Sequence, residues 1–118
     1  MTQRVNATIR MTIPAKRRGG VLEILSSLAE RSRFEPGCIA CRVYQDVEVE
    51  PVIVLEELWE SKEDLDRHLR SEEFRKVLLV VEMSLEPPEI RFDEISSSTG
   101  VETIERARNP AGKEDSGV

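Results

Sequence analysis

The sequence predicts an α+β fold of the ferredoxin-like type, in which one antiparallel sheet carries helices on a single face in the order βαββαβ. Three observations predict it. Apolar and polar residues alternate at the start and near the end of residues 5–95, as in strands that bury one side. Two β-rich runs joined by a charged connection lie in the middle, and amphipathic helical patterns flank this pair. The 118 residues suffice for one domain.

The first strand and the first helix have the clearest periodicity. From Val5 to Ile13, odd-numbered residues are apolar and even-numbered residues are polar or charged, and Pro14 ends the strand. From Ala15 to Ser32, apolar residues recur at three- and four-residue steps, which predicts a helix with one buried side. These apolar residues are Val21, Leu22, Ile24, Leu25, Leu28 and Ala29.

A hairpin is predicted next, after a turn at residues 35–37 (Glu-Pro-Gly). Its strands run from Cys38 to Gln45 and from Val52 to Trp59, with residues 46–51 as the charged connection. The strand 52–59 is apolar on both faces. One layer of helices covers only one face of a sheet, so we expect the other face to be covered by a second copy of the sheet.

Two short helices and a fourth strand complete the sheet. Ser61 to Asp64 has the form of a capping box, and Ser71 can cap a second helical segment. Residues 87–88 (Pro-Pro) end that segment, and alternation returns from Glu89 to Ile95 as the fourth strand.

The chain is expected to divide into a ferredoxin-like domain, residues 1–95, and a C-terminal extension, residues 96–118. A run of serine, threonine and glycine opens the extension. A short amphipathic helix is predicted at residues 101–108, followed by a polar tail to which we assign no function.

The charge balance excludes several classes of partner. A formal net charge of −6 repels a phosphate backbone, and the one basic cluster, residues 16–18, has no interleaved aromatic residues.

No run of roughly 18 apolar residues is present for a membrane span. The first 13 residues lack the basic start and apolar run of a secretory leader. We expect a soluble cytoplasmic protein that binds neither nucleic acid nor membrane.

Cys38 and Cys41 have the C-x-x-C spacing of redox pairs and zinc sites. The cysteines of a redox pair lie at the start of a helix, whereas these two are predicted in a strand. There, residues three apart point to opposite faces and lie roughly 10 Å apart, too far for a disulfide. Zinc requires four ligands, and the chain has two cysteines and one histidine. We expect two reduced structural thiols and no metal site.

The only tryptophan, Trp59, and the only histidine, His68, are candidate site residues. Trp59 ends a strand, and His68 follows Leu65 by three residues on the inward side of the next helix, so the two are expected to be neighbours across one layer. Packing roles remain as alternatives, since tryptophan usually fills a core and a buried histidine usually bonds a carbonyl or carboxylate.

Glu57 lies among apolar residues of the same strand, so its carboxylate must find a partner or raise its pKa. His68, Arg10 and Arg42 are the candidate partners. The sequence contains no nucleophile elbow, P-loop, dinucleotide glycine pattern or metal-ligand cluster. Any catalysis is therefore expected to work without a conventional cofactor site.

Four segments together resemble the antibiotic biosynthesis monooxygenase family of small dimeric α+β barrel proteins. They are EPGCIACRVYQD, EELWES, DLDRHLRSEEF and PPEIRF. The likeness covers about Val5 to Ile95, and W-E-S followed by L-x-x-H-L-x-S is its most specific part. It implies a homodimer whose two sheets face each other, with a small cavity between each sheet and its helices.

The resemblance also implies a reaction and a set of site residues. Characterised members oxidise phenols or quinols with O₂ and without metal or flavin, so no cofactor is expected. By the family's motif, His68 is the catalytic hydrogen-bonding group or base, and Trp59 and Glu57 bind a small aromatic substrate. We expect Phe74 to bind that substrate as well. The alternative is a non-catalytic small-molecule-binding or dimerisation module of the same fold.

A haem-degrading branch shares this fold, and three departures from it argue against haem degradation. Its haem-ligating histidine aligns with Leu78, and its strand-one asparagine aligns with Ile9. Its second helix carries tryptophan where this chain has His68.

Overall fold

The computed structural model describes residues 3–109 and confirms the α+β, ferredoxin-like prediction. In chain order the elements are β1 (Arg4–Thr12), α1 (Ala15–Ser32), β2 (Cys38–Gln45), β3 (Val52–Trp59), α2 (Lys62–Leu69), α3 (Glu72–Val81), β4 (Glu89–Ile95) and α4 (Val101–Arg108). The four strands form one sheet in the order β2-β3-β1-β4, and every neighbouring pair is antiparallel.

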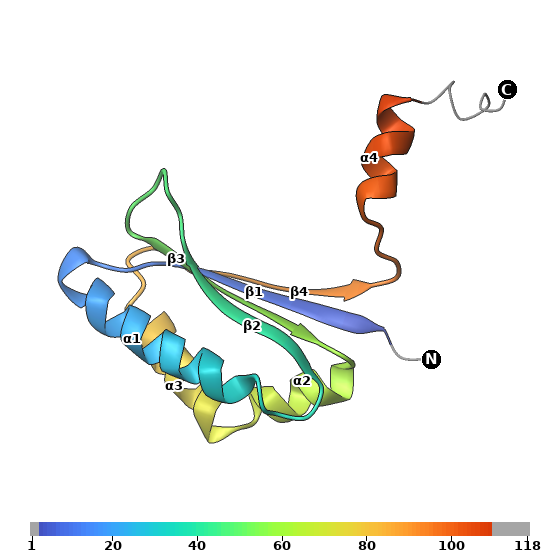
Figure 1. Cartoon of the computed structure of the whole chain (residues 1–118). Helices are drawn as coiled ribbons and strands as arrows, with labels where there is room; N and C mark the ends of the chain where they lie inside the picture. The colour runs from blue at the N-terminus through green and yellow to red at the C-terminus, as the bar shows by residue number, and fades with distance from the viewer. Residues whose placement is uncertain (1–2, 110–118) are drawn as a thin grey trace, which may run out of the picture.

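Three helices lie on one face of the sheet, and α4 stands apart on the other side of it (Figure 1). In β1 the alternation predicted from sequence is seen as alternating burial, with Val5, Ala7, Ile9 and Met11 facing the helices. Ile9 and Met11 pack in a cluster with Leu28 and other apolar residues of α1. Val5 and Ala7 pack in a second cluster with Trp59 and with Leu65 of α2. The sheet and α1–α3 thus make a two-layer unit with its hydrophobic interior between the layers.

Side-chain caps set where α2 and α3 begin. The Ser61 hydroxyl accepts a hydrogen bond from the Asp64 amide at 3.2 Å, and the Ser71 hydroxyl accepts one from the Phe74 amide at 3.1 Å. Each cap stabilises its helix by about 1 kcal/mol. Both caps match the sequence prediction, and they fix the short helix α2 so that its buried residues, Leu65 and His68, face the sheet.

Within residues 3–109 the other face of the sheet carries no helical layer, because α1, α2 and α3 all lie on the opposite side (Figure 1). On this face β3 presents Val52, Val54 and Leu58, which are buried or half-buried although no helix covers them. The helix α4 buries none of its residues, and its apolar Val101 and Ile104 are 64 % and 58 % exposed. The fold therefore leaves an apolar strand face and an amphipathic helix without packing partners among residues 3–109. In the same part of the chain, no helix combines the length and the apolar character needed to cross a membrane.

Candidate functional site

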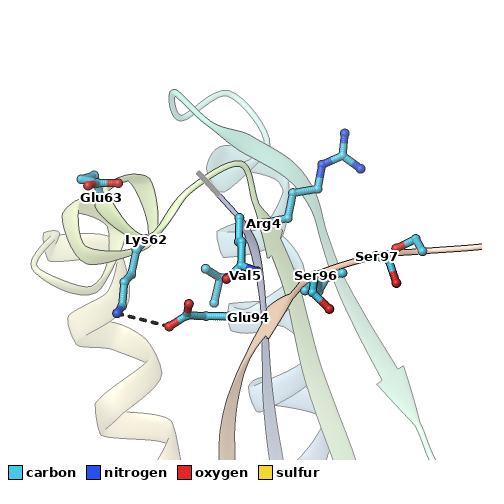
Figure 2. A pocket seen from close by; sticks show the side chains of 10 residues that line it. Arg4, Val5, Lys62, Glu63, Glu94, Ser96 and Ser97 are labelled. Atoms are coloured by element: carbon cyan, nitrogen blue, oxygen red, sulfur yellow. Dashed lines mark ion pairs between the residues drawn. The ribbon is translucent and has the colours of Figure 1, made fainter. Parts of the chain in front are cut away.

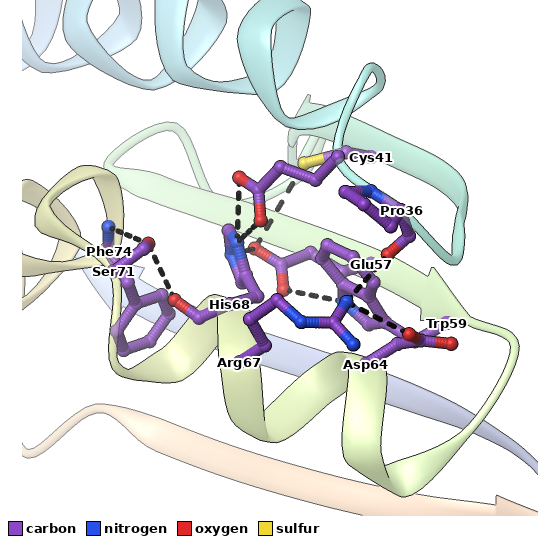
Figure 3. Close-up of polar contacts among 10 residues, drawn as sticks. Pro36, Cys41, Glu57, Trp59, Asp64, Arg67, His68, Ser71 and Phe74 are labelled. Carbon is purple, nitrogen blue, oxygen red and sulfur yellow. Dashed lines mark hydrogen bonds and ion pairs between the residues drawn. The ribbon is translucent and has the colours of Figure 1, made fainter.

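The imidazole of His68 lies in the interior between α2 and the sheet, with none of its surface exposed. The α2 helix places it there because Leu65 and His68 lie three residues apart and share the buried side. Figure 3 shows the ring directed at the strand that carries Glu57 and Trp59. His68 is therefore the centre of a polar cluster built inside an otherwise apolar layer.

Glu57 of β3 is the partner of His68 on the sheet side. Its Oε2 lies 3.1 Å from His68 Nε2, and its Oε1 accepts a hydrogen bond from the indole Nε1 of Trp59 at 3.1 Å. The Cys41 thiol contributes a weaker contact, with Sγ 4.0 Å from Glu57 Oε2. Only 2 % of Glu57 is exposed, and the three donors around its carboxylate explain how this charge is kept out of water.

Glu35, from the turn between α1 and β2, is the hydrogen-bond partner of the second ring nitrogen of His68. Its two carboxylate oxygens lie 3.0 and 3.1 Å from His68 Nδ1. An ionised carboxylate can only accept, so between two ionised carboxylates both ring nitrogens donate and the ring is an imidazolium. Burial by itself lowers the pKa of His68, but the hydrogen bonds and charges of Glu57 and Glu35 outweigh burial and raise that pKa.

Two aromatic rings flank the imidazolium. The ring centroids of Trp59 and His68 are 4.6 Å apart with the planes tilted by 32°, and Phe74 of α3 meets His68 edge-on at 5.4 Å. Both aromatic residues are buried. The cluster thus combines the imidazole with two carboxyl groups and two apolar walls.

The structure brings together all four residues that the sequence singled out, His68, Trp59, Glu57 and Phe74. Glu35 was missed, because a carboxylate in a turn carries no periodic signal of burial.

The other candidate partners of Glu57 point elsewhere. Arg10 forms an ion pair with Asp46 at 3.4 Å, and Arg42 lies opposite Glu56 on the face away from the helices. Leu78, the position of the haem ligand in the haem-degrading branch, is 48 % exposed on α3.

The prediction that Cys38 and Cys41 point to opposite faces is wrong. A β-bulge between Cys38 and Ala40 makes Cys38 the partner of Trp59 and Cys41 the partner of Glu57, so both thiols face the helices. Both are free, as expected. Burial, with the nearby Glu57 carboxylate, raises the pKa of Cys41 to about 12, so its thiol stays protonated beside that carboxylate.

Two surface hollows lie away from this cluster. One, of about 670 Å³, opens where the end of β4 meets the start of α2, and the ion pair between Lys62 and Glu94 spans it at 3.2 Å (Figure 2). The other, of about 680 Å³, runs between α1 and α3 and includes Ile24 and Leu79. Neither is lined by His68, which is itself completely buried. Among residues 3–109, no three His, Cys, Asp or Glu side chains are arranged to hold a metal ion.

Comparisons with solved structures agree on the fold. A conserved protein from Methanosarcina mazei is 24 % identical with a TM-score of 0.72, the match covering 79 % of this chain and 93 % of that one. A protein from Deinococcus radiodurans, named as a candidate antibiotic biosynthesis monooxygenase, is 16 % identical with a TM-score of 0.74 and coverages of 81 % and 96 %. A Mycobacterium tuberculosis protein is 20 % identical, with a TM-score of 0.73 and coverages of 82 % and 99 %.

The sequence itself carries the family signature. No curated protein matches the chain. The model of the antibiotic biosynthesis monooxygenase family matches residues 4–78, a span that runs from β1 into α3 and contains Glu35, Glu57, Trp59, His68 and Phe74. The chain therefore belongs to the antibiotic biosynthesis monooxygenase family.

Proposed function

We propose that the protein is a monooxygenase that oxidises a phenolic or quinol-type aromatic molecule with O₂, without a cofactor, at His68. The observation that carries this proposal is the imidazolium ring held between two carboxylates and two aromatic walls in the enclosed interior. A phenolate is planar and anionic, so an imidazolium donor and flanking rings complement it in charge and shape.

The reaction asks little of the protein beyond forming and holding the substrate anion. An ionised phenol or quinol is electron-rich enough to transfer electrons to O₂ directly. For a phenol with a free para position, one oxygen atom of O₂ replaces the ring hydrogen as a carbonyl and the other leaves as water, giving a quinone. Water exclusion strengthens the hydrogen bond from His68 to the anion, and it protects intermediates from side reactions.

Each residue has a distinct part in this proposal. His68 donates a hydrogen bond to the substrate oxygen, and Trp59 and Phe74 hold the ring by stacking and edge contact. Glu57 orients the imidazolium from the sheet side, with its own orientation set by the Trp59 indole. Positioning of this kind is a large source of rate enhancement in reactions with few covalent steps.

Oxygen uptake with a panel of quinols and phenols tests the proposal. The wild-type protein should consume O₂ faster than buffer alone and transfer one ¹⁸O atom from ¹⁸O₂ into the product. His68→Gln should slow this by about a hundredfold or more, the usual scale for a proton-handling group. Arg75→Gln, a control on the exposed side of α3, should match the wild type. Uptake by His68→Gln equal to that of the wild type would contradict the role of His68.

A second candidate, a non-catalytic binding module, is favoured by one observation. His68 is completely buried and both ring nitrogens are already bonded, as in a histidine that serves packing alone. Quinols that bind and quench Trp59 fluorescence, with no oxygen uptake above the buffer rate, would establish the binding module and exclude the monooxygenase.

We also propose that the protein is a cytoplasmic homodimer whose two uncovered sheet faces pack together. The half-buried Val54 and Leu58 on the face without helices support the dimer, and the free thiols of Cys38 and Cys41 agree with a reducing compartment. Light scattering should give twice the chain mass at micromolar concentration, and Val54→Lys should lower it. A stable wild-type monomer under these conditions would refute the dimer.

A further inference from the structure

The imidazole of His68 has no free polar atom to offer a substrate. Glu57 holds Nε2 and Glu35 holds Nδ1, both at hydrogen-bonding distance, and no part of the ring reaches solvent. An aromatic hydroxyl that bonds this ring must therefore displace one of the two carboxylates. The question is which one can leave.

Glu57 is the fixed partner. It lies on β3 in the interior of the sheet, its other oxygen accepts from Trp59 Nε1 at 3.1 Å, and 2 % of it is exposed. Moving its carboxylate would break two hydrogen bonds and leave the indole donor without its partner. A buried donor left unpaired is unfavourable, because its lost hydrogen bond is not replaced by one to water.

Glu35 is the exchangeable partner. Its side chain is 23 % exposed, it extends from a turn, and within residues 3–109 its carboxylate bonds only to His68. The turn's backbone is tied down, since the Glu60 amide donates to the Gly37 carbonyl at 2.8 Å and the Cys38 amide to the Glu35 carbonyl at 3.1 Å. Rotation of the Glu35 side chain alone would therefore uncover Nδ1 without unfolding the turn.

We propose that Glu35 is a catalytic residue, the base that ionises the aromatic hydroxyl and then yields its place on His68 Nδ1 to the resulting anion. This inference rests on the proposed function for the identity of the substrate. The substrate O–H bond breaks, its proton passes to a Glu35 carboxylate oxygen, and the electron pair stays on the substrate oxygen. That oxygen then accepts the hydrogen bond from Nδ1–H, and Glu35 releases the proton to solvent.

The exchange conserves the total charge of the ring and the two groups bonded to its nitrogens. Before it, an imidazolium faces two carboxylates, and after it the same imidazolium faces Glu57 and the substrate anion, for a net charge of −1 in both states. The other ionisable groups near the ring change little. The Cys41 thiol stays protonated, and Glu73 of α3 is paired with Arg31 of α1 at 2.8 Å. The site is thus already arranged for an anion at Nδ1.

Nitrogen NMR on the one histidine of the chain gives a single-site test. With histidine labelled at both ring nitrogens, saturating 4-nitrophenol should shift the Nδ1 signal of the wild-type protein and leave Nε2 nearly unchanged. A shift confined to Nε2 would mean that Glu57 leaves instead and would overturn the proposal. So would two unchanged signals at saturating probe.

The colour of 4-nitrophenol, which appears only in the phenolate, tests the base. At a pH where the free probe is mostly protonated, the wild-type protein should ionise the bound probe. Glu35→Gln keeps the shape and an acceptor oxygen but takes up no proton, so in stopped-flow mixing the phenolate colour should appear at least about tenfold more slowly than with the wild type. Glu30→Gln, an exposed change on α1, is the matched control and should ionise the probe as the wild type does. Equal rates of colour appearance with Glu35→Gln and the wild type would overturn the role of Glu35.

Oxygen uptake separates this inference from the proposed function. Ionised probe and a shifted Nδ1 signal without any oxygen uptake would leave Glu35 as the base of a binding site and refute the monooxygenase. Oxygen uptake that is equal in the wild type and Glu35→Gln would support the monooxygenase and overturn the role of Glu35.

Discussion

His68 Nε2 lies 3.1 Å from Glu57 Oε2, and this contact joins α2 to an interior strand of the sheet at a point that solvent does not reach. Two charges buried together are stable only when their remaining donors and acceptors are also bonded. Glu35 accepts the hydrogen bond from the other ring nitrogen of His68, and the Trp59 indole donates to the other oxygen of the Glu57 carboxylate. The cluster is consequently both a part of the core and a polar site.

Glu57→Gln should destabilise the protein by about 3 kcal/mol, because it removes one partner of a buried ion pair. It should also lower the pKa of His68, since one of the two groups that raise it loses its charge. Urea unfolding measures the first effect and an NMR titration of the single histidine measures the second. Glu30→Gln, an exposed change on α1, should change stability by no more than about 0.5 kcal/mol.

Stability should fall as the pH rises through the folded-state pKa of His68. That pKa is raised above the ordinary value of 6.5, so the charged ring binds its proton more tightly in the folded protein than in the unfolded chain. The stabilisation that the charged His68 ring contributes is fully present below about pH 6.5 and is lost above the pKa of His68 in the folded protein. The difference in free energy of unfolding between the wild type and His68→Gln should therefore shrink with rising pH. A difference that grew would contradict the imidazolium.

Cys41 should resist alkylation in the folded protein. Its thiol is fully buried, and burial raises its pKa to about 12, so almost no thiolate is present at neutral pH. In a Cys38→Ser background, iodoacetamide should label Cys41 only after unfolding in urea, as mass spectrometry would show. Rapid labelling of the native protein would mean that the layer between β2 and the helices opens readily.

Gly37→Ala should destabilise the protein, because Gly37 has φ +85° and an added Cβ would overlap the side chain of Asp64. The left-handed conformation alone costs about 1–2 kcal/mol for a residue with a side chain. Gly19→Ala is the matched control: Gly19 is exposed within α1 with open space around it, so alanine should stabilise the helix by about 1 kcal/mol. Thermal unfolding of both variants should give shifts of opposite sign.

The periodic parts of the fold could be predicted from the sequence. Alternation in β1 and the serine caps of α2 and α3 are local signals, and each element begins and ends close to where those signals place it. The sequence also predicts that Glu57 has a hydrogen-bond or ion-pair partner, since a carboxylate in an apolar strand cannot remain unpaired. His68 was one of three candidates, and only the packing of α2 on the sheet decides among them.

Two features of the site depend on information that no local pattern carries. The Glu35 carboxylate reaches His68 across 33 residues of sequence, and only the three-dimensional course of the chain sets this contact. The bulge at Ile39 adds one residue to β2 and so reverses the side on which Cys38 lies. A strict two-residue period fails wherever such an insertion occurs.

The helix α4 has eight residues and none of them is buried. In water a helix shorter than about 12 residues is marginal without tertiary contacts, so the amide protons of α4 have little to protect them in an isolated chain. Their hydrogen-exchange rates should therefore be close to those of an unstructured peptide at high dilution. Slower exchange on raising the protein concentration would make α4 a built-in reporter of self-association, readable without any substrate.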